Sequence, residues 1–227
     1  MDWPDSSIVG DSIQELHEAF CEILSQFTIA MNDCGITVFE LKSYIAHLPV
    51  FTLPIDRPTS LLNDGSENIL DFTISLSRFC DHLNPVIFEN LVKLLRHRAR
   101  ETSVLLKKYT EILEYFEKQT KLKDFVEMEY KGPILPDYSE LEIRLKDIWK
   151  EKTLADLKQL CSRINLKLWL LKRASIGSVF VVLSVPKSER DNHNDLRRKL
   201  GKEEVVIATV DGKNLYTNKE EVSPVVE

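Results

Sequence analysis

The chain contains few glycines, and no two of them lie close together. Seven glycines are spread over 227 residues, and the patterns G-x-x-x-x-G-K-[ST], G-x-G-x-x-G and G-x-S-x-G do not occur. Loops that cradle phosphates depend on clustered glycines, because only glycine lets the backbone come so close to the ligand. The sequence therefore lacks the common nucleotide-binding and hydrolase motifs, and its low glycine content favours a mainly helical chain.

Cysteine and histidine are too scattered to indicate a metal site or a disulfide framework. No C-x-x-C or H-E-x-x-H pattern occurs, and the closest cysteine–histidine pair is Cys80-x-His82. A structural zinc site requires four ligands at suitable spacing. We therefore expect no metal, no cofactor and reduced, buried thiols at Cys21, Cys34, Cys80 and Cys161. A cysteine–histidine nucleophile assembled across the sequence stays open, because catalytic groups come together in space rather than along the chain.

No segment predicts secretion or insertion into a membrane. Residues Met1–Asp5 carry no basic stretch followed by an apolar run, which a signal peptide would require. The longest apolar stretch is Val179–Val185, whereas a membrane-spanning helix requires about 20 apolar residues. We expect a soluble, cytoplasmic protein without a membrane span.

The composition is that of a globular protein with an uneven charge. Apolar residues make up 43% of the chain, enough to bury a core in a protein of this length, and the formal net charge is −6. Residues 1–60 carry nine acidic and two basic side chains, whereas residues 137–227 carry fifteen and seventeen. An acidic front and a slightly basic back predict that the two ends attract either different partners or each other.

The first 130 residues have the apolar spacing of amphipathic helices. Ser12-x-x-Glu15 and Thr37-x-x-Glu40 are capping boxes, in which two side chains satisfy the free N–H groups of a first helical turn. Residues 49–66 contain three prolines and predict a loop. The predicted organisation is a flexible N-terminus at 1–11, a helical bundle at 12–130, a linker at 131–136, an α+β unit at 137–217 and a flexible tail at 218–227.

The α+β unit is indicated by a change of period near Asn165. Before it, Leu141, Leu145, Ile148 and Trp149 are spaced as on one face of a helix. After it, apolar runs predict strands at 166–171, 178–185, 205–210 and 214–217.

The order of these elements defines the predicted fold class. Thr153-x-x-Asp156 caps a helix, and Asp211-Gly212 is suited to the type I′ turn of a hairpin. From Thr153 the expected order is α-β-β-α-β-β, which forms a four-stranded antiparallel sheet with helices on one side. The predicted class is α+β, with a mainly helical bundle followed by this small sheet.

Basic side chains gather near the ends of two expected helices. Such clusters bind phosphates, although basic residues near a helix C-terminus also complement the helix dipole. Glu189, Asp191 and Asp195 dilute the second cluster. The candidate basic patch consists of Lys93, Arg96, Arg98, Arg100, Arg197, Arg198 and Lys199.

Two stretches share a pattern of apolar positions with other proteins. One is Phe116-x-x-x-Thr120-Lys121-Leu122-Lys123-Asp124-Phe125; the other runs from Leu154-x-x-Leu157-x-x-Leu160 through Gly177-Ser178-Val179-x-Val181 and Pro186 to Thr209-Val210-Asp211-Gly212-x-x-x-Tyr216. Over residues 66–217 the chain resembles a poorly characterised module of large invertebrate multidomain signalling proteins. That module accompanies death-fold, leucine-rich-repeat or nucleotide-binding receptor domains. The resemblance implies an adaptor or scaffold in intracellular, innate-immune-like signalling, and it supplies no catalytic residues.

A non-enzymatic module that binds other proteins requires no feature that the sequence lacks. We therefore expect an adaptor or scaffold rather than an enzyme, with other proteins as its partners. The alternative is a nucleic-acid-binding protein that uses the basic helix ends. An enzyme with a dispersed site is a third hypothesis, and it predicts a deep polar pocket with convergent titratable groups.

Overall fold

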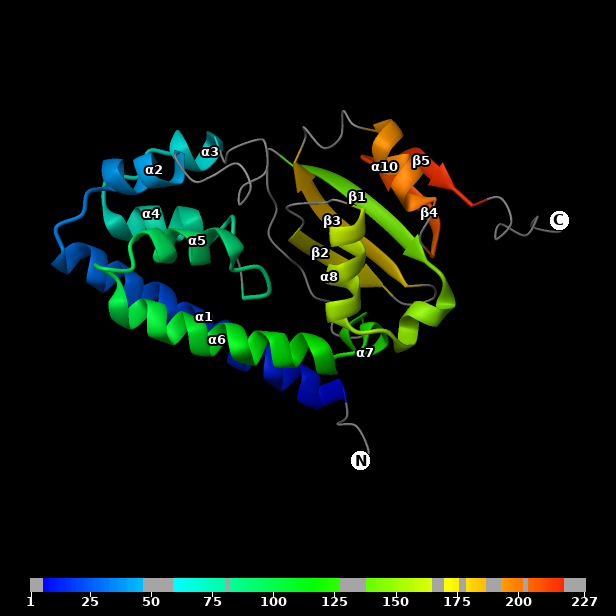
Figure 1. Ribbon diagram of the computed structural model, residues 1–227, viewed down its shortest axis with the longest axis horizontal. Coiled ribbons are helices and arrows are strands. Elements are labelled where there is room, and N and C mark those ends of the chain that lie inside the picture. Colours follow the sequence, from blue (N-terminus) through cyan, green and yellow to red (C-terminus); the bar gives the residue numbers. More distant parts are fainter. Residues whose placement is uncertain are drawn as a thin grey trace. The chain divides into compact units, whose positions relative to one another are not determined.

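A computed structural model of the chain (Figure 1) divides into two compact units, Met1–Phe116 and Glu117–Glu227. We call the first the helical unit and the second the sheet unit. The described residues are 6–46, 59–80, 82–126, 138–164, 170–175, 179–186, 193–201 and 204–218.

The described part of the helical unit consists of helices joined by short turns. The last of them, α6, continues three residues beyond the boundary into the sheet unit. The helices are α1 (Ser6–Asp33), α2 (Val38–Ala46), α3 (Thr59–Leu62), α4 (Ile69–Leu76), α5 (Val86–Leu94) and α6 (Arg100–Gln119).

The junction of α1 and α2 follows the sequence prediction, but the start of α1 does not. Helix α1 begins at Ser6 rather than at Ser12, so part of the predicted flexible N-terminus is helical. Gly35 has a φ of 64° and ends the helix, because glycine adopts this left-handed conformation without a steric penalty. At the start of α2 the Thr37 N–H donates to Glu40 Oε2 over 2.8 Å, and the Glu40 N–H donates to Thr37 Oγ1 over 3.2 Å. The second capping box is confirmed.

Two further segments separate helices of this unit. Residues 49–58 of the predicted proline-rich loop lie outside the described residues, and 59–62 of that loop form α3. A second break lies between Leu94, the last residue of α5, and Arg100, the first of α6.

Aromatic rings form the centre of the helical unit. Phe88 on α5 meets the rings of Phe20 and Phe27 on α1 edge-on, with centroids 5.9 Å and 5.2 Å apart. Tyr109 on α6 lies 5.7 Å from Phe20, and its hydroxyl donates to the backbone carbonyl of His82. These buried rings stabilise the packing of α1, α5 and α6 against one another, because edge-to-face contacts add to the favourable free energy of burying the rings.

The sheet unit combines five strands with short helices. Helix α7 precedes the first strand, η1 and α8 follow it, and α10 follows the third strand, an arrangement typical of the α+β class. Its elements are α7 (Leu122–Val126), β1 (Tyr138–Leu145), the 3-10 helix η1 (Asp147–Glu151), α8 (Leu154–Arg163), β2 (Leu170–Ser175), β3 (Phe180–Pro186), α10 (His193–Leu200), β4 (Val205–Val210) and β5 (Lys213–Thr217).

The strands form one antiparallel sheet in the order β2-β3-β1-β4-β5. Leu141 in the central strand β1 pairs with Leu183 of β3 on one side and with Val210 of β4 on the other. The elements β1-α8-β2-β3-α10-β4 follow the connectivity of the split βαβ, or ferredoxin-like, motif, and β5 extends it by a hairpin. The α+β class is confirmed, and strands β3 to β5 correspond to three of the four that the sequence predicts. Strand β2 begins at Leu170 and shares only residues 170 and 171 with the strand predicted at 166–171, of which 166–169 lie outside the described residues.

Strand β1 is the fifth strand, and the helix predicted over this segment is wrong. Residues Leu141 and Leu145 are four positions apart, a spacing that places them on one face of a helix and also on one face of a strand. Ile143 distinguishes the two, because it is fully buried, whereas a helix would turn it away from Leu141. Only the following η1 is helical; there Trp149 is buried and Ile148 is exposed.

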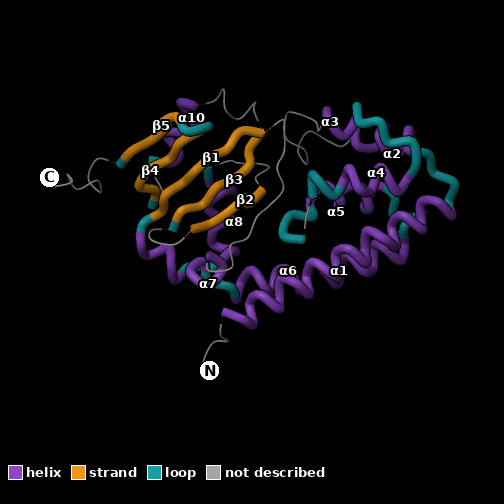
Figure 2. The backbone as a smooth tube through the Cα atoms, turned by 180° about the vertical axis from the view of Figure 1, so that it is seen from behind, coloured by secondary structure: helices purple, strands orange, loops and turns teal. Residues whose placement is uncertain are grey.

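The two faces of the sheet differ. Strand β1 buries its odd-numbered residues from Ser139 to Leu145, whereas Glu140, Glu142 and Arg144 lie on the opposite face. Helix α8 lies in front of the sheet in Figure 1 and behind it in Figure 2. The face opposite the buried residues of β1 therefore carries two carboxylates and one guanidinium along its central strand, and the fully buried Val182 of β3 lies beside Glu142 on this face.

The backbone of residues 120–122 pairs with the segment that precedes α8. Lys121 forms an isolated antiparallel bridge with Thr153, and the Leu122 N–H donates to the Lys152 carbonyl over 2.8 Å. These contacts place residues 117–126 in the sheet unit, although the sequence assigned them to the helical bundle. The predicted linker at 131–136 lies outside the described residues, as does the tail from 219 onward.

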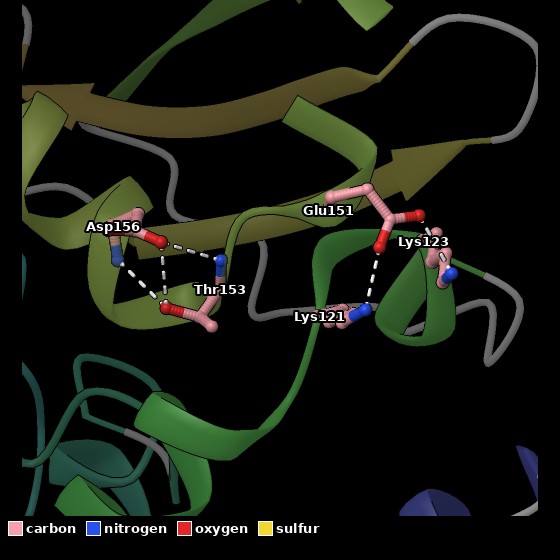
Figure 3. A network of polar contacts seen from close by, with 5 residues as sticks. All are labelled: Lys121, Lys123, Glu151, Thr153 and Asp156. Atoms are coloured by element: carbon pink, nitrogen blue, oxygen red, sulfur yellow. Dashed lines mark hydrogen bonds and ion pairs between the residues drawn. The ribbon is translucent and has the colours of Figure 1, made fainter. Parts of the chain in front are cut away.

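Side chains reinforce the same contact (Figure 3). Lys121 Nζ lies 2.6 Å from Glu151 Oε2, and Lys123 Nζ lies 2.8 Å from Glu151 Oε1. Hydrogen bonds from Lys121 and Lys123 lower the pKa of Glu151 to about 2. Because Glu151 is exposed, these ion pairs contribute little to the free energy of unfolding. Their main effect is to orient α7 against η1.

Figure 3 also shows the capping box of α8, in which Thr153 Oγ1 accepts from the Asp156 N–H and Asp156 Oδ2 accepts from the Thr153 N–H.

Replacing Thr153 by alanine should lower the free energy of unfolding by about 1 kcal/mol, because the Asp156 N–H loses its acceptor. Ser162→Ala on the same helix is the control, since its hydroxyl donates to the Lys158 carbonyl and caps nothing. Urea-dependent labelling of the buried Cys161 thiol measures both variants. Equal midpoints for the two variants would contradict the cap.

Candidate functional site

The helical unit has an apolar groove between α1 and α4. The groove has a volume of about 290 Å³. A stretch of α1 forms one wall, and nearly the whole of α4 forms the other. Each of the two helices buries another of its faces elsewhere in the unit. The lining residues are Cys21, Leu24, Ser25, Thr28, Ile29, Leu70, Thr73, Ile74 and Ser77.

Three large aliphatic side chains of the groove remain exposed. Ile29 on α1 is 50% exposed, and Leu70 and Ile74 on α4 are 57% and 52% exposed. Their helices already bury another apolar face, which includes Phe27 and Phe72. Helix α4 is thus apolar on two faces, and its second face is available to a partner.

Hydroxyl groups close the floor of the groove. Thr28 Oγ1 lies 3.0 Å from Thr73 Oγ1 and 3.0 Å from the Leu24 carbonyl oxygen. Thr73 Oγ1 in turn donates to the Ile69 carbonyl over 2.9 Å. These threonines satisfy one another and their own helices, so the floor offers apolar contact rather than hydrogen bonds to a ligand.

A cysteine–histidine pair that the sequence analysis did not identify lies at one wall. Cys21 Sγ is 3.6 Å from His17 Nε2, one turn earlier on α1, and both side chains are exposed. The His17 ring also meets the His82 ring edge-on at 5.3 Å. Cys21 is exposed and lines the groove, so the reactivity of its thiol reports access to the groove.

The four cysteines are free, as predicted, but only half of them are buried. Cys80 and Cys161 are buried, whereas Cys21 and Cys34 are exposed, so the prediction of buried thiols is wrong for these two. Burial raises the pKa of the Cys161 thiol. Among the described residues, no three His, Cys, Asp or Glu side chains group as metal ligands would.

The candidate basic patch falls into two clusters, one in each unit. In the helical unit, Arg96, Arg98 and Arg100 are exposed around the turn between α5 and α6. Lys93, at the end of α5, forms a 3.6 Å ion pair with Glu89. This cluster presents guanidinium groups around one turn of the chain.

The second cluster is partly neutralised within α10 by Asp195. Arg198 Nη2 lies 2.6 Å from Asp195 Oδ1, and Lys199 Nζ lies 2.5 Å from Asp195 Oδ2. The hydrogen bond from Lys199, followed by that from Arg198, lowers the pKa of Asp195. Arg197 is exposed. The carboxylate that the sequence analysis regarded as diluting this cluster pairs directly with two of its members.

In comparisons with known proteins, no family model, curated protein or solved structure matches the chain. Within the described residues, no helix has both the length and the hydropathy that crossing a bilayer requires. The chain has an α+β fold, and its helical unit carries an apolar groove.

Proposed function

We propose that the chain is a non-enzymatic protein–protein interaction module, an adaptor or scaffold, whose helical unit binds an amphipathic helix of a partner in the α1–α4 groove. One observation carries the proposal. Ile29, Leu70 and Ile74 are half exposed around a single groove instead of being scattered over the surface. Contiguous apolar side chains in a groove between two helices are typical of helix recognition.

The groove offers the contacts that such recognition uses. Leu70 and Ile74 are one turn apart on α4, and Ile29 faces them from α1. A third helix laid along the groove places its own apolar residues, three and four positions apart, between these side chains. Burial of apolar surface then drives association at about 25 cal/mol per Å².

The chemistry of the groove supports binding over catalysis. Its lining residues include no carboxylate, histidine, lysine or arginine. An active site is expected to bring several titratable groups together around a substrate. Here one thiol stands among aliphatic side chains and hydroxyls, so the proposal does not include an enzymatic reaction.

Nucleic-acid binding is the second candidate, and the cluster of Arg96, Arg98 and Arg100 favours it. All three side chains are exposed, and no ion pair to Arg96 or Arg100 occurs among the described residues. Against it, Arg198 and Lys199 are paired with Asp195. A salt-dependent gel shift with RNA or DNA that Arg96→Gln/Arg100→Gln abolishes would support this candidate.

The signalling context remains a proposal that rests on the resemblance to invertebrate multidomain proteins. An adaptor in such a pathway would join two partners at separate surfaces. The groove supplies one surface, and the charged side chains Glu140, Glu142 and Arg144 on one face of β1 supply a second of different character. Cytoplasmic action belongs to the same proposal.

The proposed function predicts that Ile74→Gln weakens partner binding about tenfold, because a half-exposed isoleucine contributes about 1 to 1.5 kcal/mol when a partner covers it. The matched control is Ile112→Gln on α6, where isoleucine is 56% exposed, against 52% for Ile74. Tagged protein recovered from native cells after nuclease treatment, with quantitative mass spectrometry, measures the effect. Equal recovery of associated proteins with both variants and with the unmodified chain would contradict the proposal that the groove binds a partner. If nuclease treatment by itself removes the associated proteins, the second candidate, nucleic-acid binding, is favoured.

A further inference from the structure

The groove has an acidic rim on its α1 side. Helix α1 carries acidic residues but no lysine or arginine. Glu18 and Glu22 are exposed, and each lies three positions before a lining residue, Cys21 and Ser25 respectively. Residues three or four apart occupy the same face of a helix. Both carboxylates therefore border the groove.

The α4 side is acidic as well. Asp71 is exposed and follows Leu70 directly, and Glu67, also exposed, precedes Leu70 by three positions. The Asp71 carboxylate accepts a 2.7 Å hydrogen bond from Asn68 Nδ2, which holds it at the start of the helix. Arg78, one residue beyond the last lining residue Ser77, is the basic side chain at the far end. Around the aliphatic centre, carboxylates thus prevail on both walls.

From this charge distribution we infer that the partner segment is a basic amphipathic helix, with lysine or arginine flanking its apolar stripe. The inference rests on the proposed function and names its partner class. The three exposed aliphatic side chains require an apolar stripe in the partner. The partner's side chains on either side of that stripe come close to the carboxylates on both walls, and only basic side chains complement these carboxylates.

The electrostatic contribution is expected to affect the rate of association more than the lifetime of the complex. The rim carboxylates are exposed, so water and salt screen them beyond about 8 to 10 Å at physiological ionic strength. Complementary rim charges steer partners together, and apolar contacts then hold them. An acidic helix with the same apolar stripe loses this steering and is repelled by Glu18, Glu22, Glu67 and Asp71.

The same rim disfavours two other occupants. Anionic lipid surfaces and nucleic-acid phosphates meet four carboxylates around the groove, which repel them. A second copy of α10 would bring basic side chains, but its apolar residues Leu196 and Leu200 are buried in their own unit. A basic helix of a different protein satisfies both the apolar and the charged requirement.

The test uses the full chain and two synthetic peptides of about 18 residues, five helical turns. Both carry the same leucine stripe; one has lysine at every flanking position and the other glutamate. Fluorescence anisotropy should show the lysine peptide binding at least about tenfold more tightly at about 0.02 M salt, and most of this preference should vanish at about 0.5 M salt. Ile74→Gln should weaken both peptides.

Neutralising the rim separates charge from apolar contact. Glu18→Gln/Glu22→Gln should reduce the preference for the lysine peptide severalfold, whereas Glu101→Gln/Glu111→Gln, exposed carboxylates of α6, should leave it unchanged. If both peptides bind equally and Ile74→Gln weakens both, the basic-helix inference is overturned while the proposed function stands. Tighter binding of the glutamate peptide also overturns it. If neither peptide binds, the inference and the groove as a helix-binding site fail together.

Discussion

Replacing Ile143 by aspartate should unfold the sheet unit. Ile143 is fully buried in the central strand β1, where its Cα pairs with Val181 of β3 and Ala208 of β4. A carboxylate at this position has no partner, and an unpaired buried charge costs several kcal/mol. That cost is comparable to the whole stability of a small domain.

The matched control is Arg144→Asp, which introduces the same side chain one residue later. Arg144 is exposed on the opposite face of the strand, so its replacement is expected to change the free energy of unfolding by only about 0.5 kcal/mol. Labelling of the Cys161 thiol reports on the sheet unit, because Cys161 is fully buried there. Ile143→Asp should make this thiol reactive without denaturant.

The same pair of variants decides between strand and helix for this segment. A helix over 137–149 with Leu141 and Leu145 inward turns Ile143 to the surface, where aspartate is harmless. Protection of Cys161 in Ile143→Asp equal to that in Arg144→Asp would therefore contradict the strand β1 and the sheet order built on it.

Replacing Phe88 by alanine should destabilise the helical unit by about 3 to 5 kcal/mol, because it removes a fully buried ring and leaves a cavity. The ring contacts Phe20 and Phe27 of α1, so its loss weakens the packing of α5 against α1. Urea-dependent labelling of the buried Cys80 thiol in the same unit reports the change.

Phe39→Ala is the control for Phe88→Ala. Phe39 on α2 is 81% exposed, so the same substitution removes a ring that packs against little. The expected change is within about 0.5 kcal/mol. A midpoint for Phe88→Ala as high as that for Phe39→Ala would mean that the aromatic centre of the helical unit is not where the structure places it.

Local signals predicted the parts of the fold that depend on neighbouring residues. The capping boxes at Thr37 and Thr153 form as the spacing indicates. Asp211 and Gly212 have φ values of 47° and 73°, the left-handed conformations that a type I′ turn requires. Each of these features is decided within four residues, so no tertiary context is needed to predict it.

The errors arose where one pattern fits two structures. Leu141 and Leu145 share a face in a helix and in a strand, and only the pairing of β1 with β3 and β4 selects the strand. Those partners lie about 40 and 65 residues later in the sequence, beyond the reach of local spacing. Likewise, the attachment of residues 120–122 to Lys152 and Thr153 depends on the folded unit.

The groove was missed because a helical stripe alone does not tell which apolar face another helix covers. In α4, Ile69, Phe72 and Leu76 form one apolar stripe, and these residues are buried. Leu70 and Ile74 fall on a second apolar face of the same helix, which was the signal available in the sequence. The acidic front of residues 1–60 was visible in the sequence, and it supplies Glu18 and Glu22 on the α1 side of the groove.

The most direct test of the central claim is the labelling rate of Cys21 compared with that of Cys34, in native cells and in the purified chain. Both thiols are exposed, but only Cys21 lines the groove. If a partner helix fills the groove, Cys21 is labelled severalfold more slowly in cells, Cys34 is unchanged, and Ile74→Gln restores the rate at Cys21. An identical ratio of the two rates in cells and in the purified chain would contradict the proposal that this groove is a protein-binding site.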